Sequence, residues 1–132
     1  KRDLKNLVVH RGRETFILLN RFPYQGGHLM IAPFEHKADL ADFTMVERAE
    51  TFDFLILAQR VLQEAMHPHG FNIGLNVGRP AGAGVPGHLH FHVVPRWIGD
   101  TNFMTSVSNV KVIPQALEEL CGELQKSFRK GR

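Results

Sequence analysis

Histidine stands at every second position in the segment His88-Leu89-His90-Phe91-His92. Side chains of a β-strand alternate between its two faces, so this spacing predicts a strand with three imidazoles on one face. The other face would carry Leu89, Phe91 and Val93, which can pack on a core. Neighbouring side chains on one face lie about 7 Å apart, a span that suits a phosphate group and its flanking oxygens.

A glycine-rich segment, residues 82–87, leads into this strand. Glycine has no Cβ, so such a segment lets backbone amides approach an anion closely. Imidazoles beside a cradle of amides favour phosphoryl or nucleotidyl chemistry. A metal site is the alternative, because His-x-His on a strand is a common ligand spacing. Catalytic metal sites often add a carboxylate, and the first acidic residue after the motif, Asp100, lies beyond a proline.

The length of 132 residues is enough for one domain with one core. No apolar run reaches the roughly 20 residues that cross a bilayer, and no signal peptide is recognisable, so we expect no membrane partner. The single cysteine, Cys121, excludes an internal disulfide and favours a reducing compartment, which predicts a cytoplasmic protein. The first residue is Lys1, and we expect that a short upstream segment is missing.

The net charge of +3 is concentrated near the two ends of the chain. Basic residues at chain ends are typical of solvated tails. The sequence lacks the interleaved basic and aromatic residues of a groove for single-stranded nucleic acid. We therefore expect no nucleic-acid partner, and a small polyanionic molecule suits the charge at least as well.

Alternating apolar positions and turn residues predict four strands besides the histidine strand, over residues 6–10, 15–20, 27–32 and 71–77. The expected hairpin turn between the first two is Arg11-Gly12-Arg13. A final helix begins at Pro114, with an apolar stripe of Leu117, Leu120, Cys121, Leu124 and Phe128. Hairpin-like connections indicate an α+β fold, in which helices pack on an antiparallel sheet. Three further histidines fit surface positions: His10, His67 and His69.

The longest predicted helix begins at a capping box, Thr44-Met45-Val46-Glu47, and continues to about Met66. Apolar residues recur along it at helical spacing: Phe54, Ala58, Val61, Leu62 and Ala65. Further apolar residues make this face unusually wide: Val46, Ala49, Phe52, Leu55 and Ile56. Two interpretations stay open. One face packs on the sheet and another on a second subunit, or the helix is simply well buried.

The segment 82–97 resembles the signature of the histidine triad (HIT) family, His-φ-His-φ-His-φ-φ, in which φ is an apolar residue. Residues 16–23 and 27–33 are similar to the nucleotide-binding hairpin of that family, and the resemblance covers about residues 6–115. Residues 94–103 look most like a bacterial branch that contains diadenosine tetraphosphate phosphorylases, with nucleotidyl transferases as relatives. The resemblance implies a HIT-like α+β domain over residues 1–132. That fold has a five-stranded antiparallel sheet, one long helix and a shorter C-terminal helix, and is commonly paired into a homodimer.

The resemblance also implies a nucleotide-binding enzyme with a covalent intermediate. His90 would attack the α-phosphorus of a nucleotide anhydride, and water or inorganic phosphate would then resolve the nucleotidyl-histidine. This requires a neutral attacking nitrogen on His90 and a hydrogen bond that holds the other nitrogen, as to a backbone carbonyl. His92 would hold phosphate oxygens, while His88 and His28 orient the site and share protons. The expected nucleotide contacts are the ribose at Asn20, the phosphates at Asn76, and the loop amides at Gly84 and Val85.

Two features depart from the family pattern. Hydrolytic members usually carry Gln and then Ser or Thr where this chain has Gly84 and Val85, which favours transfer to phosphate over hydrolysis. Some relatives hold a structural zinc ion through an upstream Cys-x-x-Cys pair and two histidines, whose positions here are His36 and His88. This sequence contains no cysteine pair, so we predict no metal from these residues, and zinc only if an upstream segment supplies the cysteines.

The leading prediction is an enzyme that cleaves or transfers at the α-phosphate of a purine nucleotide anhydride, such as diadenosine tetraphosphate. Two alternatives stay open: a nucleotide-binding regulatory module with little turnover, and a metal-dependent hydrolase built on the three histidines. An intact His90 favours the enzyme, since a binding module has no use for that nucleophile. Phosphorolysis and hydrolysis both stay open, as do a dimer and a tetramer.

Overall fold

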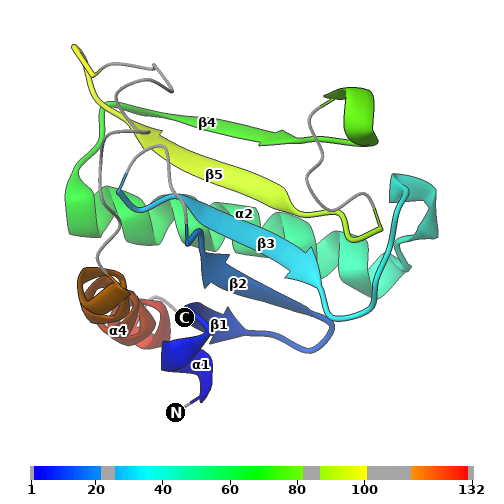
Figure 1. Cartoon of the computed structure of the whole chain (residues 1–132), viewed down its shortest axis with the longest axis horizontal. Helices are drawn as coiled ribbons and strands as arrows, with labels where there is room; N and C mark the ends of the chain where they lie inside the picture. The colour runs from blue at the N-terminus through cyan, green and yellow to red at the C-terminus, as the bar shows by residue number, and fades with distance from the viewer. Residues whose placement is uncertain (1, 22–25, 82–86, 101–113, 131–132) are drawn as a thin grey trace.

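The computed structural model describes residues 2–21, 26–81, 87–100 and 114–130. In chain order the elements are α1 (Arg2–Lys5), β1 (Val8–Arg11), β2 (Thr15–Leu19), β3 (Leu29–Pro33), the 3-10 turn η1 (Leu40–Asp42), α2 (Met45–Met66), β4 (Gly70–Leu75), the 3-10 turn η2 (Arg79–Ala81), β5 (Phe91–Arg96) and α4 (Pro114–Lys130). The strands form one antiparallel sheet in the order β1-β2-β3-β5-β4, and α2 lies across one face of it (Figure 1). The predicted α+β fold is confirmed: a five-stranded antiparallel sheet with one long helix and a shorter C-terminal helix.

The core forms between the sheet and α2. Residues that pair directly across neighbouring strands share a face of the sheet: Ile17 with Ile31, Leu19 with Leu29, and Leu29 with Val93. All of these side chains are buried, and they pack with four buried residues of α2: Phe54, Ala58, Val61 and Leu62. Burying each large apolar side chain contributes roughly 1.5–3 kcal/mol, and this burial holds α2 on one face of the sheet. The opposite face is therefore the one that can carry a functional site.

Helix α4 covers the β1 edge of the sheet. Its predicted apolar stripe includes three buried residues: Cys121, Leu124 and Phe128. Gln125 Nε2 donates to the carbonyl oxygen of Val8 at 2.8 Å, which ties the helix to β1. The ring centroid of His10 lies 5.1 Å from that of Phe54 and 5.5 Å from that of Phe128. The prediction of a surface position for His10 is wrong, because α4 comes from more than a hundred residues away along the chain to cover it.

Most element boundaries match the predicted ones to within about two residues, and the histidine strand is the exception. β5 begins at Phe91, so His88 and His90 precede it. Helix α2 has the predicted capping box, in which the Thr44 hydroxyl accepts from Glu47 N and the Glu47 carboxylate accepts from Thr44 N. The short helix α1 and the 3-10 turns η1 and η2 were not predicted. Within the described parts of the chain, no helix is long and apolar enough to cross a membrane.

One carboxylate ties the β1–β2 turn to α2. Glu50 accepts hydrogen bonds of 2.6–2.8 Å from the backbone N–H groups of Arg13, Glu14 and Thr15 and from the Thr15 hydroxyl. Burial raises the pKa of Glu50, but these hydrogen bonds outweigh burial, so the pKa is lowered overall. Gly12 is required beside them, because a Cβ there would lie 2.6 Å from Cδ of Glu50. A residue of α2 that lies far along the chain therefore stabilises the conformation of this turn.

Replacing Glu50 with Ala leaves these turn donors without their acceptor. We expect the free energy of unfolding, measured by urea denaturation, to fall by about 2–3 kcal/mol. Glu64→Ala, at an exposed position of the same helix, is the matched control and should change it by less than about 0.5 kcal/mol. An equal loss in the two variants would contradict the role assigned to Glu50.

Candidate active site

Three histidines meet on the face of the sheet opposite α2. His28 immediately precedes β3, His90 immediately precedes β5, and His92 lies within β5. His28 Nε2 is 2.8 Å from His92 Nδ1, and the ring centroids of His90 and His92 are 4.8 Å apart. The pairing of β3 with β5 sets Met30 opposite His92, which brings the two segments together across 64 residues of sequence.

A backbone carbonyl fixes which nitrogen of the neutral His90 ring carries the proton. Its Nδ1 lies 3.1 Å from the carbonyl oxygen of His88. A carbonyl accepts and cannot donate, so the proton of the neutral ring is on Nδ1 and Nε2 keeps its lone pair. The predicted hydrogen bond to a backbone carbonyl is confirmed, and its acceptor lies two residues earlier in the chain.

A second chain of hydrogen bonds fixes His28 and His92. Asn20 Nδ2 lies 3.1 Å from His28 Nδ1 and can only donate, so His28 carries its proton on Nε2. That proton is directed at His92 Nδ1, which accepts at 2.8 Å. His92 is therefore protonated on Nε2, and this N–H can donate to an anion. Neighbouring histidines thus have opposite tautomers: His90 presents a lone pair, and His92 presents a proton.

Burial favours the neutral forms of His28 and His92. Burial, together with the weaker repulsion from His92 and His90, lowers the pKa of His28 to about 4. Burial also lowers the pKa of His92, with His90 as the second cause.

His88 contacts the end of β3 and the loop that follows it. Its Nε2 is 2.8 Å from the carbonyl oxygen of Pro33, and its ring stacks on that of His36 with centroids 4.4 Å apart. The prediction that all three imidazoles line one strand face is therefore wrong at His88. The cause is that the chain bends before β5, where Leu89 N donates to the carbonyl oxygen of Lys37 at 2.7 Å. Leu89 is buried on the core side, as predicted.

The two histidines considered for zinc, His36 and His88, stack on each other. Nε2 of His88 is engaged with Pro33, as described above. In the part of the chain that the structure describes, no group of three or more His, Cys, Asp or Glu side chains could hold a metal ion. The two histidines would need further ligands from elsewhere to bind zinc.

The other predicted contacts differ in their placement. The amide of Asn20 faces His28, a contact that the sequence analysis missed, and its ribose contact stays a prediction. Asn76 is exposed and directly follows Leu75, which pairs with Phe91, so it lies at the end of the sheet where His90 lies. Gly84 and Val85 lie outside the described residues.

The sequence analysis also missed Gly74, which pairs directly with His92 and therefore shares its face of the sheet. A Cβ at this position would meet nothing within 4 Å, so the space beside His92 is open. A glycine inside a strand signals a close approach of another group, and this signal was available from the sequence.

The lowered pKa of His28 predicts acid-sensitive stability. Between about pH 6.5, the ordinary histidine pKa, and about pH 4, the unfolded chain binds a proton that the folded protein does not. The stabilisation is complete above pH 6.5 and is lost as the pH falls to 4, by about 3 kcal/mol in total. His28→Gln should flatten this part of a urea-denaturation profile. The same slope in wild type and His28→Gln would overturn the assignment.

Comparison with known proteins agrees with this geometry. A family model described as "HIT domain" matches residues 1–97. AP-4-A phosphorylase of Mycobacterium tuberculosis is 48% identical over 117 residues, which cover 89% of this chain and 60% of that protein. Bis(5'-adenosyl)-triphosphatase of Saccharomyces cerevisiae is 33% identical over 91 residues, 68% of this chain and 44% of that protein. The chain thus spans 60% or less of the length of these two curated relatives.

The fold is similar to that of a hypothetical histidine triad nucleotide-binding protein from Sulfolobus tokodaii strain7. The TM-score is 0.79 at 24% identity, and the match covers 98% of this chain and 87% of that one. The likeness in fold extends over nearly the whole chain, and the family match includes the histidine motif and both strands that carry it. The chain belongs to the HIT domain family.

Proposed function

We propose that this chain is a nucleotidyl-transferring enzyme that cleaves dinucleoside polyphosphates at an α-phosphate, with His90 as nucleophile. The observation that carries the proposal is the 3.1 Å hydrogen bond between His90 Nδ1 and the His88 carbonyl, which leaves Nε2 unprotonated. The identity to AP-4-A phosphorylase over 89% of the chain supports the substrate class. A cytoplasmic location is part of the proposal, because the free, buried Cys121 suits a reducing compartment.

In the first step His90 Nε2 attacks the α-phosphorus of diadenosine tetraphosphate. An N–P bond forms, the bridging P–O bond breaks, and ATP leaves as an anion. The imidazole of His90 then carries positive charge, which its Nδ1–H shares with the His88 carbonyl. The Nε2–H of His92 donates to a phosphate oxygen as negative charge develops there.

In the second step an acceptor attacks the same phosphorus and releases His90. Inorganic phosphate as acceptor gives ADP, and water gives AMP. We propose phosphate, because the chain has Gly84 and Val85 where hydrolytic relatives usually carry Gln and then Ser or Thr. The name of the phosphorylase relative supports the same choice.

Product analysis with diadenosine tetraphosphate tests both steps. With inorganic phosphate we expect ADP and ATP, and without it little AMP. His90→Ala should lower kcat by about four to six orders of magnitude, because it removes the nucleophile, and should still bind nucleotide in equilibrium dialysis. His69→Ala, at an exposed position outside the cluster, is the control and should keep wild-type turnover.

Each alternative predicts a different result in the same experiment. AMP and ATP without phosphate would make the protein a hydrolase. Nucleotide binding with no turnover that depends on His90 would favour a regulatory module. Activity that chelators remove would favour a metal-dependent hydrolase.

A homodimer is also part of the proposal. α2 exposes Phe52 at 65% and Ile56 at 44%, and the edge strand β4 exposes Ile73 at 46%. Large exposed apolar residues together with an unpaired strand edge are typical of a surface that another chain covers. A second copy is the partner we propose, since two-fold pairing of identical patches is the commonest assembly.

Phe52→Glu should convert the dimer to a monomer, because it sets a charge into the apolar surface. Light scattering at matched concentrations measures the change in mass. Leu4→Glu is the control, since Leu4 is an exposed apolar residue on α1, which contacts β1 at the opposite sheet edge. A wild-type protein of monomeric mass would contradict the proposal.

A further inference from the structure

A single peptide unit connects the loop after β3 with His90. This unit joins His88 to Leu89. Its N–H, from Leu89, donates to the carbonyl oxygen of Lys37 at 2.7 Å. Its carbonyl, from His88, accepts from His90 Nδ1 at 3.1 Å. Because the peptide unit is planar and rigid, any shift at Lys37 turns the acceptor that orients the His90 ring.

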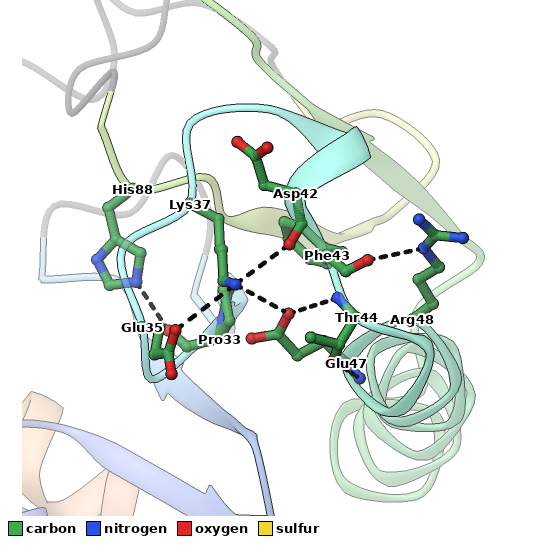
Figure 2. A network of polar contacts seen from close by, with 9 residues as sticks. All are labelled: Pro33, Glu35, Lys37, Asp42, Phe43, Thr44, Glu47, Arg48 and His88. Atoms are coloured by element: carbon green, nitrogen blue, oxygen red, sulfur yellow. Dashed lines mark hydrogen bonds and ion pairs between the residues drawn. The ribbon is translucent and has the colours of Figure 1, made fainter.

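The side chain of Lys37 anchors that loop to the start of α2. Its Nζ lies 3.1 Å from the carbonyl oxygen of Asp42, 3.6 Å from Glu47 Oε1 and 3.5 Å from Glu35 Oε2. Figure 2 shows the ammonium reaching from the loop toward the first turn of the helix, with His88 on the other side of the same loop. Glu47 is itself held by the capping box through its bond from Thr44 N.

The two carboxylates near Lys37 are not equivalent. The side chain of Glu47 is 3% exposed and that of Lys37 is 15% exposed, so each needs the other as its counter-charge. The side chain of Glu35 is 75% exposed, and a pair in water contributes little. The pair that matters for position is therefore Lys37 with Glu47, and it spans the loop and the helix.

A second tie secures the same loop. His88 Nε2 lies 2.8 Å from the carbonyl oxygen of Pro33, the last residue of β3. The residues before β5 thus contact this loop and the end of β3 at two points, through the His88 side chain and through the backbone N–H of Leu89. Residues 88–90 lie outside the strands, and these two contacts tie them to the loop after β3.

We propose that Lys37 is a positioning residue for the nucleophile. Its ammonium, held by Glu47 and the Asp42 carbonyl, fixes its own carbonyl, and this fixes the His88–Leu89 peptide plane and the orientation of His90. Lys37 acts through that peptide and touches no reacting atom. Its kinetic consequence rests on the proposed function, whereas its effect on the tautomer of His90 does not.

Lys37→Met keeps the length of the side chain and removes the ammonium. We expect kcat with diadenosine tetraphosphate and phosphate to fall about 10- to 100-fold, because a misplaced nucleophile slows chemistry, while KM changes little. Lys37→Arg restores the charge and should recover part of the lost kcat. Glu35→Gln, which changes the exposed carboxylate partner of Lys37, is the matched control and should keep wild-type kcat.

The second readout is the ¹⁵N NMR spectrum of the histidine rings in the free protein. Wild type should show His90 protonated on Nδ1, and Lys37→Met should show a mixture of tautomers at His90 with His92 unchanged. This measurement needs no turnover. It therefore tests the inference even if diadenosine tetraphosphate is not cleaved.

Three results would overturn the proposal. One is an unchanged His90 tautomer in Lys37→Met. Another is an unchanged kcat in a protein that does cleave the substrate. The third is a fall of kcat in Glu50→Gln as large as that in Lys37→Met, because Glu50→Gln weakens only the contacts between α2 and the distant β1–β2 turn.

If Lys37→Met does not fold, Glu47→Gln is the second variant, because it keeps the capping box but removes the counter-charge of Lys37. A shift toward mixed His90 tautomers in that variant supports the proposal, and none overturns it.

Discussion

The pairing of β3 with β5 is the constraint on which both the core and the site depend. It sets Leu29 against Val93 on one face and Met30 against His92 on the other. Because side chains alternate along each strand, the register that buries the apolar pair also turns the imidazole away from α2. A slip of one residue would exchange the two faces. The hydrogen bonds between β3 and β5 therefore determine both the packing of the core and the geometry of the site.

Burial and hydrogen bonds fix the tautomers of the histidines in the candidate site. His28 is 1% exposed, and burial holds it neutral together with His92. Hydrogen bonds to a carbonyl and an amide then decide which nitrogen of each ring carries its proton. Comparable groups in water would exchange tautomers freely. Here the fold selects one arrangement, and the cost is a loss of stability in acid.

Local patterns in the sequence predicted the fold well, and contacts between distant segments account for the errors. The capping box of α2 and the start of α4 at Pro114 depend on neighbouring residues and were predicted correctly. The neighbours of His10 and His88 come from far along the chain, in Phe128 and Pro33, so their local patterns could not reveal them. Alternation predicted three imidazoles on one strand face. The ladder begins at Phe91, and its start is set by the loop that Lys37 anchors.

The hydrogen bonds from Asn20 through His28 to His92 have a further consequence. An amide nitrogen cannot accept a hydrogen bond, so the contact between Asn20 Nδ2 and His28 Nδ1 carries no proton away from His28. These two contacts form a series of aligned dipoles with a fixed direction. Its positive end is the Nε2–H of His92. In the proposed reaction, this part of the site would stabilise negative charge through an orientation that the fold sets before any ligand binds.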